Sequence, residues 1–180
     1  MWMPPICFVS KAAEFAACRH TGMTRKARGN EPYVNHLAEV ANILATATGG
    51  RDAELIAAGW LHDTIEDTAT TQEELAEEFS ERVADLVAEV TDDMRLPKSE
   101  RRRLQVVDSP GKSSSAKLIK IADKISNVRA RIHSDPTPDQ RVDLTDYVDW
   151  AERVVAGCRG NIAELDRMFD DTVKLARSSL

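Results

Sequence analysis

The sequence is poor in the residues that cross-link small proteins. Its three cysteines, Cys7, Cys18 and Cys158, are widely scattered and form no C-x-x-C pair. This pattern excludes a disulfide framework, which needs cysteines in pairs, and a thiolate zinc site, which needs closely spaced ones. It predicts a reducing, cytoplasmic setting for the chain.

A long apolar run is also missing. The apolar N-terminal segment MWMPPICFVS lacks a basic start and is interrupted by Pro4 and Pro5. It is therefore too short and too broken for a signal peptide or a membrane-spanning helix. We expect residues 1–10 to form a short N-terminal arm.

The chain has no excess of positive charge. Its 30 acidic and 24 basic residues argue against a general nucleic-acid binder and against a protein that binds anionic membranes. Two local basic patches remain, at 25–28 and 95–103. A chain of 180 residues is long enough to bury one sizeable core without disulfides or metals, so we expect a single domain.

What the sequence does have is helical periodicity. Ala, Leu, Glu and Arg dominate, and apolar residues recur at the spacing of one helix face, which predicts an all-α fold. Gly49 and Gly50 are expected to end the second helix, and Asp52 to cap the third. The expected helices are residues 10–19, 36–48, 53–67, 72–79, 81–91, 97–107, 115–132, 138–158 and 161–176.

Ionisable residues are embedded in the apolar faces of three of these helices. His62 and Asp63 follow apolar residues of the third helix at helical spacing, and His36 aligns with the apolar face of the second. Asp123 stands among isoleucines in KLIKIADKISNVRA. Two buried carboxylates beside two imidazoles need a compensating cation, which a divalent metal would supply. This mixed nitrogen and oxygen set suits Mn²⁺, Fe²⁺, Co²⁺ or Mg²⁺ at least as well as Zn²⁺.

A structural explanation stays open for each of these residues alone. A histidine on an apolar helix face is most often a hydrogen-bonded core residue. Asp63 and Asp123 can instead form ion pairs within the fold. The candidate partners are Lys120, Lys124 and Arg129.

Two further carboxylates follow one helical turn later. Glu66 and Asp67 lie four residues after His62 and Asp63, so they project from the same side of the helix. Negative charges near a helix C-terminus are disfavoured by the helix dipole. The pair is either a solvated acidic helix end, which is common, or a carboxylate pair that orients or deprotonates a water at the metal.

Together the motifs resemble a known family. His36, the HD pair at 62–63 and Asp123 resemble the HD-domain superfamily of metal-dependent phosphohydrolases. HDTIEDT, RKARGNEPYVNH and KLIKIADKISNVR look like the hydrolase domain of the RelA/SpoT family. EVTDDMRLPKSERRRLQV and YVDWAERVV are similar to the small alarmone hydrolases of the metazoan SpoT-homologue type. The similarity covers nearly the whole chain.

The resemblance implies a single-domain helical bundle of about nine or ten helices. It implies a hydrolase that binds one Mn²⁺ and removes the 3′-pyrophosphate of guanosine tetra- or pentaphosphate. The implied division of the chain is an N-terminal arm at 1–10, a hydrolase domain at 11–165 and a C-terminal helix end and tail at 166–180. The implied metal ligands are His36, His62, Asp63 and Asp123, and the implied catalytic residues are Glu66, Asp67 and Asn127. The implied substrate-binding residues are Arg25, Lys26, Tyr33, Lys98 and Tyr147.

The chain departs from the family pattern near Tyr147. The small hydrolases tend to have an arginine four residues before this tyrosine, whereas here Asp143 holds that place and Arg141 lies six residues before. For the arginines at 101–103, the sequence favours a solvated helix face.

Two other functions stay open at this point. One is a phosphatase for another sugar-phosphorylated nucleotide, such as the 2′-phosphate of NADPH. The other is a nucleotide sensor built on the same fold without catalysis. The sequence does not indicate the oligomeric state.

Overall fold

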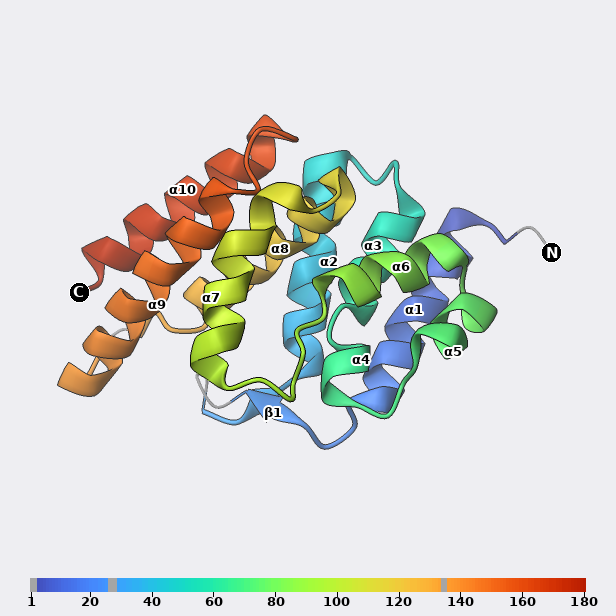
Figure 1. Ribbon diagram of the computed structural model, residues 1–180, viewed down its shortest axis with the longest axis horizontal. Coiled ribbons are helices and arrows are strands. Elements are labelled where there is room, and N and C mark those ends of the chain that lie inside the picture. The colour runs from blue at the N-terminus through green and yellow to red at the C-terminus, as the bar shows by residue number, and fades with distance from the viewer. Residues whose placement is uncertain (1–2, 26–28, 134–135) are drawn as a thin grey trace.

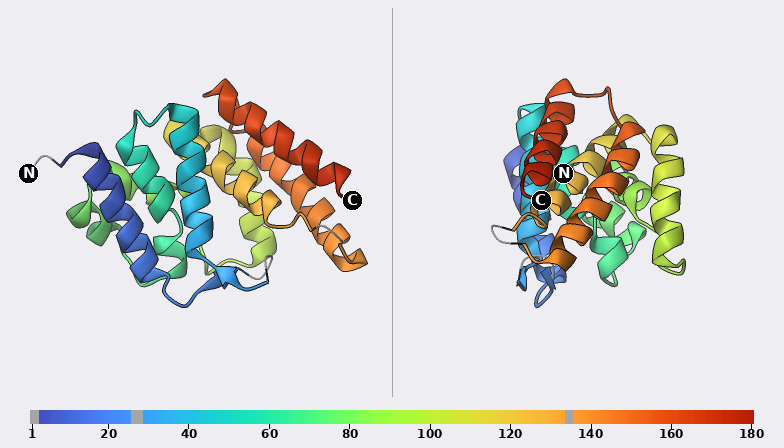
Figure 2. Two further views of the ribbon diagram at one scale, coloured as in Figure 1. Left: turned by 180° about the vertical axis from the view of Figure 1, so that it is seen from behind. Right: turned by 90° about the vertical axis from the view of Figure 1, so that its left-hand side faces the viewer.

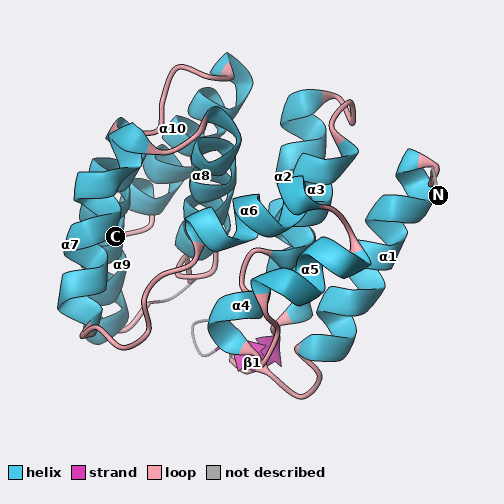
Figure 3. Cartoon of the chain, turned by 45° about the vertical axis from the view of Figure 1, so that its right-hand side comes forward, coloured by secondary structure: helices cyan, strands magenta, loops and turns pink. Residues whose placement is uncertain are grey.

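The computed structural model describes residues 3–25, 29–133 and 136–180, and within these ranges the chain is almost entirely helical (Figure 3). The all-α prediction is confirmed. None of the described helices is both long enough and apolar enough to cross a lipid bilayer. The helices are α1 (Pro5–Arg19), α2 (Val34–Thr48), α3 (Ala53–Leu61), α4 (Thr64–Asp67), α5 (Gln72–Glu78), α6 (Glu81–Val90), α7 (Lys98–Asp108), α8 (Ser114–Arg129), α9 (Pro138–Ala156) and α10 (Ala163–Ser178).

Two short elements join these helices. The 3₁₀ turn η2 (Ser109–Gly111) connects α7 to α8. The strands β1 (Thr24–Arg25) and β2 (Glu31–Pro32) pair antiparallel between α1 and α2, where the sequence indicates only an irregular segment.

Helices α2 and α8 form the centre of the molecule (Figure 1). Helix α2 packs against α3 on one side and against α8 on the other, and α8 also packs against α9 and α10. Helix α1 covers α3 at one end of the molecule, while α9 and α10 lie at the opposite end (Figure 2). Residues from α2, α3 and α8 can therefore meet in the middle of the fold.

Local chemistry sets the helix ends where the sequence predicts them. Gly49 ends α2 in the left-handed conformation, at φ 63°, which glycine adopts without strain. The Asp52 carboxylate accepts the N–H of Leu55 at 3.0 Å and caps α3. Thr137 and Gln140 form a capping box at the start of α9.

The predicted single helix at 53–67 is wrong, because the helix breaks at His62 and Asp63. The His62 Nδ1 atom lies 2.9 Å from the Gly59 carbonyl oxygen, and the Thr64 hydroxyl donates to the Leu61 carbonyl oxygen at 2.6 Å. These side chains compete with backbone N–H groups for the same carbonyls, which favours a break. The break frees His62 and Asp63 from the strict spacing of a continuous helix.

The predicted N-terminal arm is helical over most of its length. Helix α1 begins at Pro5, in the first turn, where a missing N–H costs nothing. Phe8 packs edge-on against Phe79, with ring centres 5.8 Å apart, so this segment is anchored to the fold. At the other end, α10 continues to Ser178. The division of the chain into arm, hydrolase domain and tail stays a prediction.

The end of α9 leaves no room for a side chain at Gly157. A Cβ atom there would lie 2.8 Å from the Ser109 Cβ and 2.9 Å from the Pro110 Cδ, closer than real contacts allow. Gly157→Ala should therefore lower the free energy of unfolding by about 1–3 kcal/mol, as measured by urea denaturation. Gly111→Ala is the matched control, because a Cβ there meets nothing within 4 Å. Equal stability of the two variants would contradict this packing.

Candidate active site and metal centre

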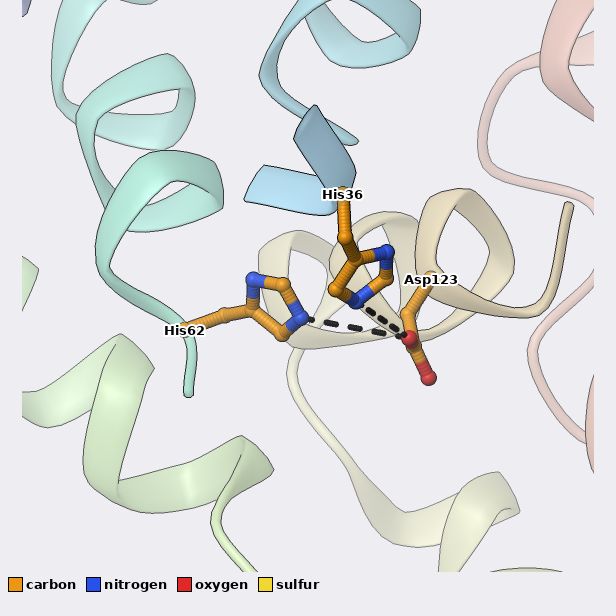
Figure 4. A group of neighbouring side chains, drawn as sticks. All are labelled: His36, His62 and Asp123. Atoms are coloured by element: carbon orange, nitrogen blue, oxygen red, sulfur yellow. Dashed lines mark ion pairs between the residues drawn. The ribbon is translucent and has the colours of Figure 1, made fainter. Parts of the chain in front are cut away.

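Two histidines and two aspartates meet where α2, α8 and the α3–α4 junction converge. The His36 Nε2 atom lies 3.4 Å from Asp63 Oδ2 and 3.3 Å from Asp123 Oδ1. The His62 Nε2 atom lies 3.1 Å from Asp63 Oδ2 and 3.9 Å from Asp123 Oδ1. Metal bonds of about 2.1 Å place adjacent ligand atoms about 3 Å apart and opposite ones about 4 Å apart. The ligand atoms of His36, His62 and Asp123 lie within 4.8 Å of one another, which matches one coordination sphere, and Asp63 lies beside the two histidines (Figure 4 shows the first three).

Hydrogen bonds behind the two histidines orient their rings. His62 Nδ1 lies 2.9 Å from the Gly59 carbonyl, which can only accept, so Nδ1 donates and Nε2 keeps its lone pair. His36 Nδ1 lies 2.8 Å from the Ser126 hydroxyl oxygen, and that hydroxyl donates to Glu39 at 2.6 Å. The Ser126 oxygen therefore accepts from His36. Both Nε2 atoms face the cluster as potential metal ligands.

The cluster attracts a positive charge. The His62 Nε2 atom is buried and has no well-aligned hydrogen bond within the described part of the chain, which is costly for a polar atom. Burial acts to lower the pKa of His62, but Asp63 and Asp123 raise it to about 9. A divalent metal with nitrogen and oxygen ligands fits this site.

Neighbouring side chains hold the two carboxylates in place. The Tyr33 hydroxyl donates to Asp63 Oδ2 at 2.6 Å, and the Asn127 amide donates to Asp123 Oδ1. The Lys124 ammonium lies 2.7 Å from Asp123 Oδ2. Burial opposes the ionisation of Asp123, but Lys124 and the histidines keep its pKa well below the usual range. The ion pair that the sequence leaves open for Asp123 therefore forms within the cluster itself.

The cluster opens into a cavity of about 300 Å³ with a basic wall. This size lies at the lower end of the range for small-molecule sites. Among the described residues, Lys98 and Arg102 have no carboxylate partner. The combination suits a ligand that carries several negative charges. The cations on the wall are Lys98, Arg101, Arg102, Lys120, Lys124 and Arg131.

Glu66 also faces this cavity. Its Oε2 atom accepts the N–H of Asp92 at 3.1 Å, and its Oε1 atom lies 3.6 Å from Arg101 Nη1. Burial and the negative charge of Asp63 raise the pKa of Glu66 to about 7. A carboxylate with a pKa near neutrality is suited to accept a proton from a water molecule and to release it again.

A family model for the HD domain matches residues 12–148. The chain belongs to the HD-domain family. HD domains bind divalent metals, and the group formed by His36, His62 and Asp123 is where this chain can hold one.

Relatives of this HD-domain protein match it over most of their length. The guanosine-3′,5′-bis(diphosphate) 3′-pyrophosphohydrolase MESH1 of Xenopus tropicalis is 44% identical over 167 residues, which are 91% of this chain and 93% of that protein. The Homo sapiens MESH1 is 43% identical over 164 residues, at 91% and 92% coverage. A solved structure of a metazoan orthologue of SpoT that hydrolyses ppGpp superposes with a TM-score of 0.86 and 35% identity, covering 99% of this chain and 100% of that one.

The HD-domain cavity brings together most of the residues that the sequence predicts for the site. Asp67 is exposed and is not among the lining residues. Arg25 is buried behind the cavity, where it donates to the Ser126 carbonyl and to Asn127 Oδ1 at 3.2 and 3.1 Å. Lys26 lies outside the described residues. The individual roles stay predictions. The predicted residues that line the cavity are Tyr33, His36, His62, Asp63, Glu66, Lys98, Asp123, Asn127 and Tyr147.

The predicted solvated face at 101–103 is wrong for Arg101 and Arg102 and holds for Arg103. Arg101 and Arg102 line the cavity, and Arg103 alone of the three faces solvent, where it pairs with Glu100. Helical spacing is the signal that could have revealed this, because positions i, i+3, i+4 and i+7 share one face of a helix. The face of α7 that lines the cavity consists of Lys98, Arg101, Arg102 and Gln105.

The hydrogen bond from His36 to Ser126 should strengthen metal binding. Ser126→Ala removes the acceptor of the Nδ1 proton, so the affinity for Mn²⁺ should fall about 10- to 100-fold, as measured by calorimetry. Ser178→Ala, at an exposed serine of α10, is the control and should bind like wild type. Unchanged affinity in a folded Ser126→Ala protein would show that this contact does not orient the ligand.

The pKa of Glu66 predicts a pH-dependent stability for protein stripped of metal by a chelator. Between pH 4.5 and 7 the unfolded state loses the proton of Glu66 while the folded state keeps it, so stability falls as the pH rises. Glu66→Gln has no carboxylate to ionise, so this loss of stability is absent. At pH 8 its free energy of unfolding should exceed that of wild type by about 1–3 kcal/mol, and at pH 4 this pH-dependent difference should be small. Urea denaturation across this range measures the effect.

Glu77→Gln is the control for the pH experiment, because Glu77 is an exposed carboxylate on the neighbouring helix α5. Its stability should follow that of wild type at every pH. A constant offset between Glu66→Gln and wild type across the range would mean that Glu66 ionises normally in the folded protein.

Proposed function

We propose that this HD-domain protein is a manganese-dependent hydrolase that removes the 3′-diphosphate of guanosine tetra- or pentaphosphate. The products are pyrophosphate and GDP or GTP. The observation that carries the proposal is the buried His–Asp cluster at the wall of a cation-lined cavity. The names of the relatives support the same substrate, because they describe a 3′-pyrophosphohydrolase of guanosine-3′,5′-bis(diphosphate).

The charge of the cavity suits this substrate. Guanosine tetraphosphate carries four phosphate groups, and a chain of net charge −6 would repel it without a local concentration of cations. Lys98 and Arg102 are exposed or half-buried at the cavity and free of carboxylates within the described ranges, so they are available for charge-assisted hydrogen bonds to phosphate oxygens.

The chemistry is a hydrolysis at the 3′ side of the ribose. A water oxygen forms a bond to the phosphorus atom attached to O3′, the bond between that phosphorus and O3′ breaks, and O3′ takes up a proton. When bound, the metal polarises the phosphoryl oxygen and offsets its developing charge. Glu66 accepts the proton of the attacking water, a role that its raised pKa supports. Tyr33 and Asn127 keep Asp63 and Asp123 oriented.

Manganese is the proposed metal because the resemblance to the RelA/SpoT-type hydrolases implies it. The donor atoms are compatible with this choice, since two imidazoles and two carboxylates suit Mn²⁺, as they also suit Fe²⁺, Co²⁺ or Mg²⁺. His36 and Asp123 would bind from α2 and α8, and His62 and Asp63 from the α3–α4 junction.

Incubation of the protein with guanosine tetraphosphate and Mn²⁺ should release pyrophosphate. Asp63→Asn should lose metal and activity but keep its fold, because the apolar core does not need the metal. Glu66→Gln should keep the metal and lose activity about 100-fold or more, since it cannot accept a proton. Failure of metal-loaded wild-type protein to release pyrophosphate would refute the proposal.

The same assay separates the alternatives. If phosphate is released from NADPH faster than pyrophosphate is released from guanosine tetraphosphate, the protein is better described as a phosphatase for the 2′-phosphate of NADPH. If wild-type protein binds the nucleotide tightly but does not hydrolyse it, and Glu66→Gln binds it equally tightly, the protein is a non-catalytic sensor.

A further inference from the structure

Arg131 is a cation on the cavity wall that none of the sequence motifs contains. It follows the end of α8, and its Nη1 atom donates to the Asn127 carbonyl at 2.8 Å. Asp123 and Asn127 stand four residues apart on one side of α8, and the guanidinium of Arg131 turns back to the second of them from just beyond the helix end at Arg129. Arg131 therefore lines the same cavity as Asp123 and Asn127, from the segment that follows α8.

The guanidinium of Arg131 is held on three sides. It lies 3.8 Å from the centre of the Tyr147 ring, and its Nε atom is 3.1 Å from Asp143 Oδ2. Only 19% of the side chain is exposed. Within the part of the chain that the structure describes, no group pairs with Nη2. The Nη2 edge of the Arg131 guanidinium is thus available for a ligand at the wall of the cavity.

Stability alone does not account for this arrangement. The Asp143 side chain is 61% exposed, and ion pairs at such positions contribute little to stability. Arg159 is held in a similar way, because it pairs with Asp170 and lies 5.6 Å from the centre of the Phe169 ring, but it does not line the cavity. What distinguishes Arg131 is its place on the cavity wall. A rigid guanidinium fork matches the geometry of two phosphate oxygens.

We propose that Arg131 binds the 5′-phosphate chain of the nucleotide and so sets the preference for substrates phosphorylated at both ends. This inference rests on the proposed function. Asp123 stands six residues before the end of α8 at Arg129, an axial rise of about 9 Å at about 1.5 Å per residue, and Arg131 follows that end. A nucleotide that has its 3′-diphosphate at the metal cluster and its ribose turned toward the end of α8 would bring its 5′-phosphates to the free edge of Arg131.

Steady-state kinetics with substrates that differ at the 5′ end test this role. Arg131→Gln should raise KM for guanosine tetraphosphate about 10- to 100-fold and leave kcat within about threefold, because the lost contact exists before and during the reaction. The KM of guanosine 3′-diphosphate, which has no 5′-phosphate, should be unchanged. An equal KM change for both substrates, or none for either, would overturn the proposal.

Arg159→Gln is the matched control. It removes an arginine that also contacts a carboxylate and an aromatic ring but lies away from the cavity, so KM should be unchanged. Should Arg131→Gln not fold, Arg131→Lys carries the same test. It keeps the charge without the fork and should raise KM for guanosine tetraphosphate several-fold, again with no effect on guanosine 3′-diphosphate.

Calorimetry distinguishes failure of this inference from failure of the proposed function. Arg131→Gln should weaken the binding of GDP, which keeps the 5′-diphosphate, about 10-fold or more, and should leave the binding of guanosine unchanged. Absence of pyrophosphate release by wild type would refute the proposed reaction. Equal GDP affinity of wild type and Arg131→Gln would refute the role of Arg131.

Discussion

The placement of two largely covered carboxylates beside two buried imidazoles is the constraint around which the centre of this protein is built. Each of these groups has a neighbour that orients it: Ser126 for His36, Gly59 for His62, Tyr33 for Asp63 and Asn127 for Asp123. The supporting groups come from the same elements as the ligands or from the residue before α2. The central packing of α2 between α3 and α8 is what allows this set to form.

The charge distribution around the cluster follows the same logic. The chain is acidic as a whole, yet its cavity wall is basic, and several wall cations lie beside a carboxylate: Lys124 beside Asp123, Lys120 beside Asp92 and Arg101 beside Glu66. Such pairs lower the cost of burying like charges together. A polyanion that enters can therefore meet cations that are already oriented by the protein.

Periodicity is sufficient to predict most of the helices, because helix formation depends on residues close in sequence. The cluster, whose members are far apart in the chain, is predicted instead from ionisable residues on apolar helix faces and from the resemblance to the HD-domain superfamily. The break at His62 could not be predicted, since it depends on side chains competing for the Gly59 and Leu61 carbonyls. The orientation of Arg131 depends in the same way on two residues of α9, Asp143 and Tyr147. Long-range packing decides these features, and a linear pattern does not contain it.

The ligand cluster draws on segments that are far apart in the chain. His36 belongs to α2, His62 follows α3 and Asp123 belongs to α8, so one ion bound by all of them would be a reversible cross-link between residues 36–62 and a residue two-thirds of the way along the chain. Binding to the folded state alone shifts the folding equilibrium toward it. The resistance of this protein to proteolysis, and with it its lifetime in a cell, would then follow the local supply of the metal.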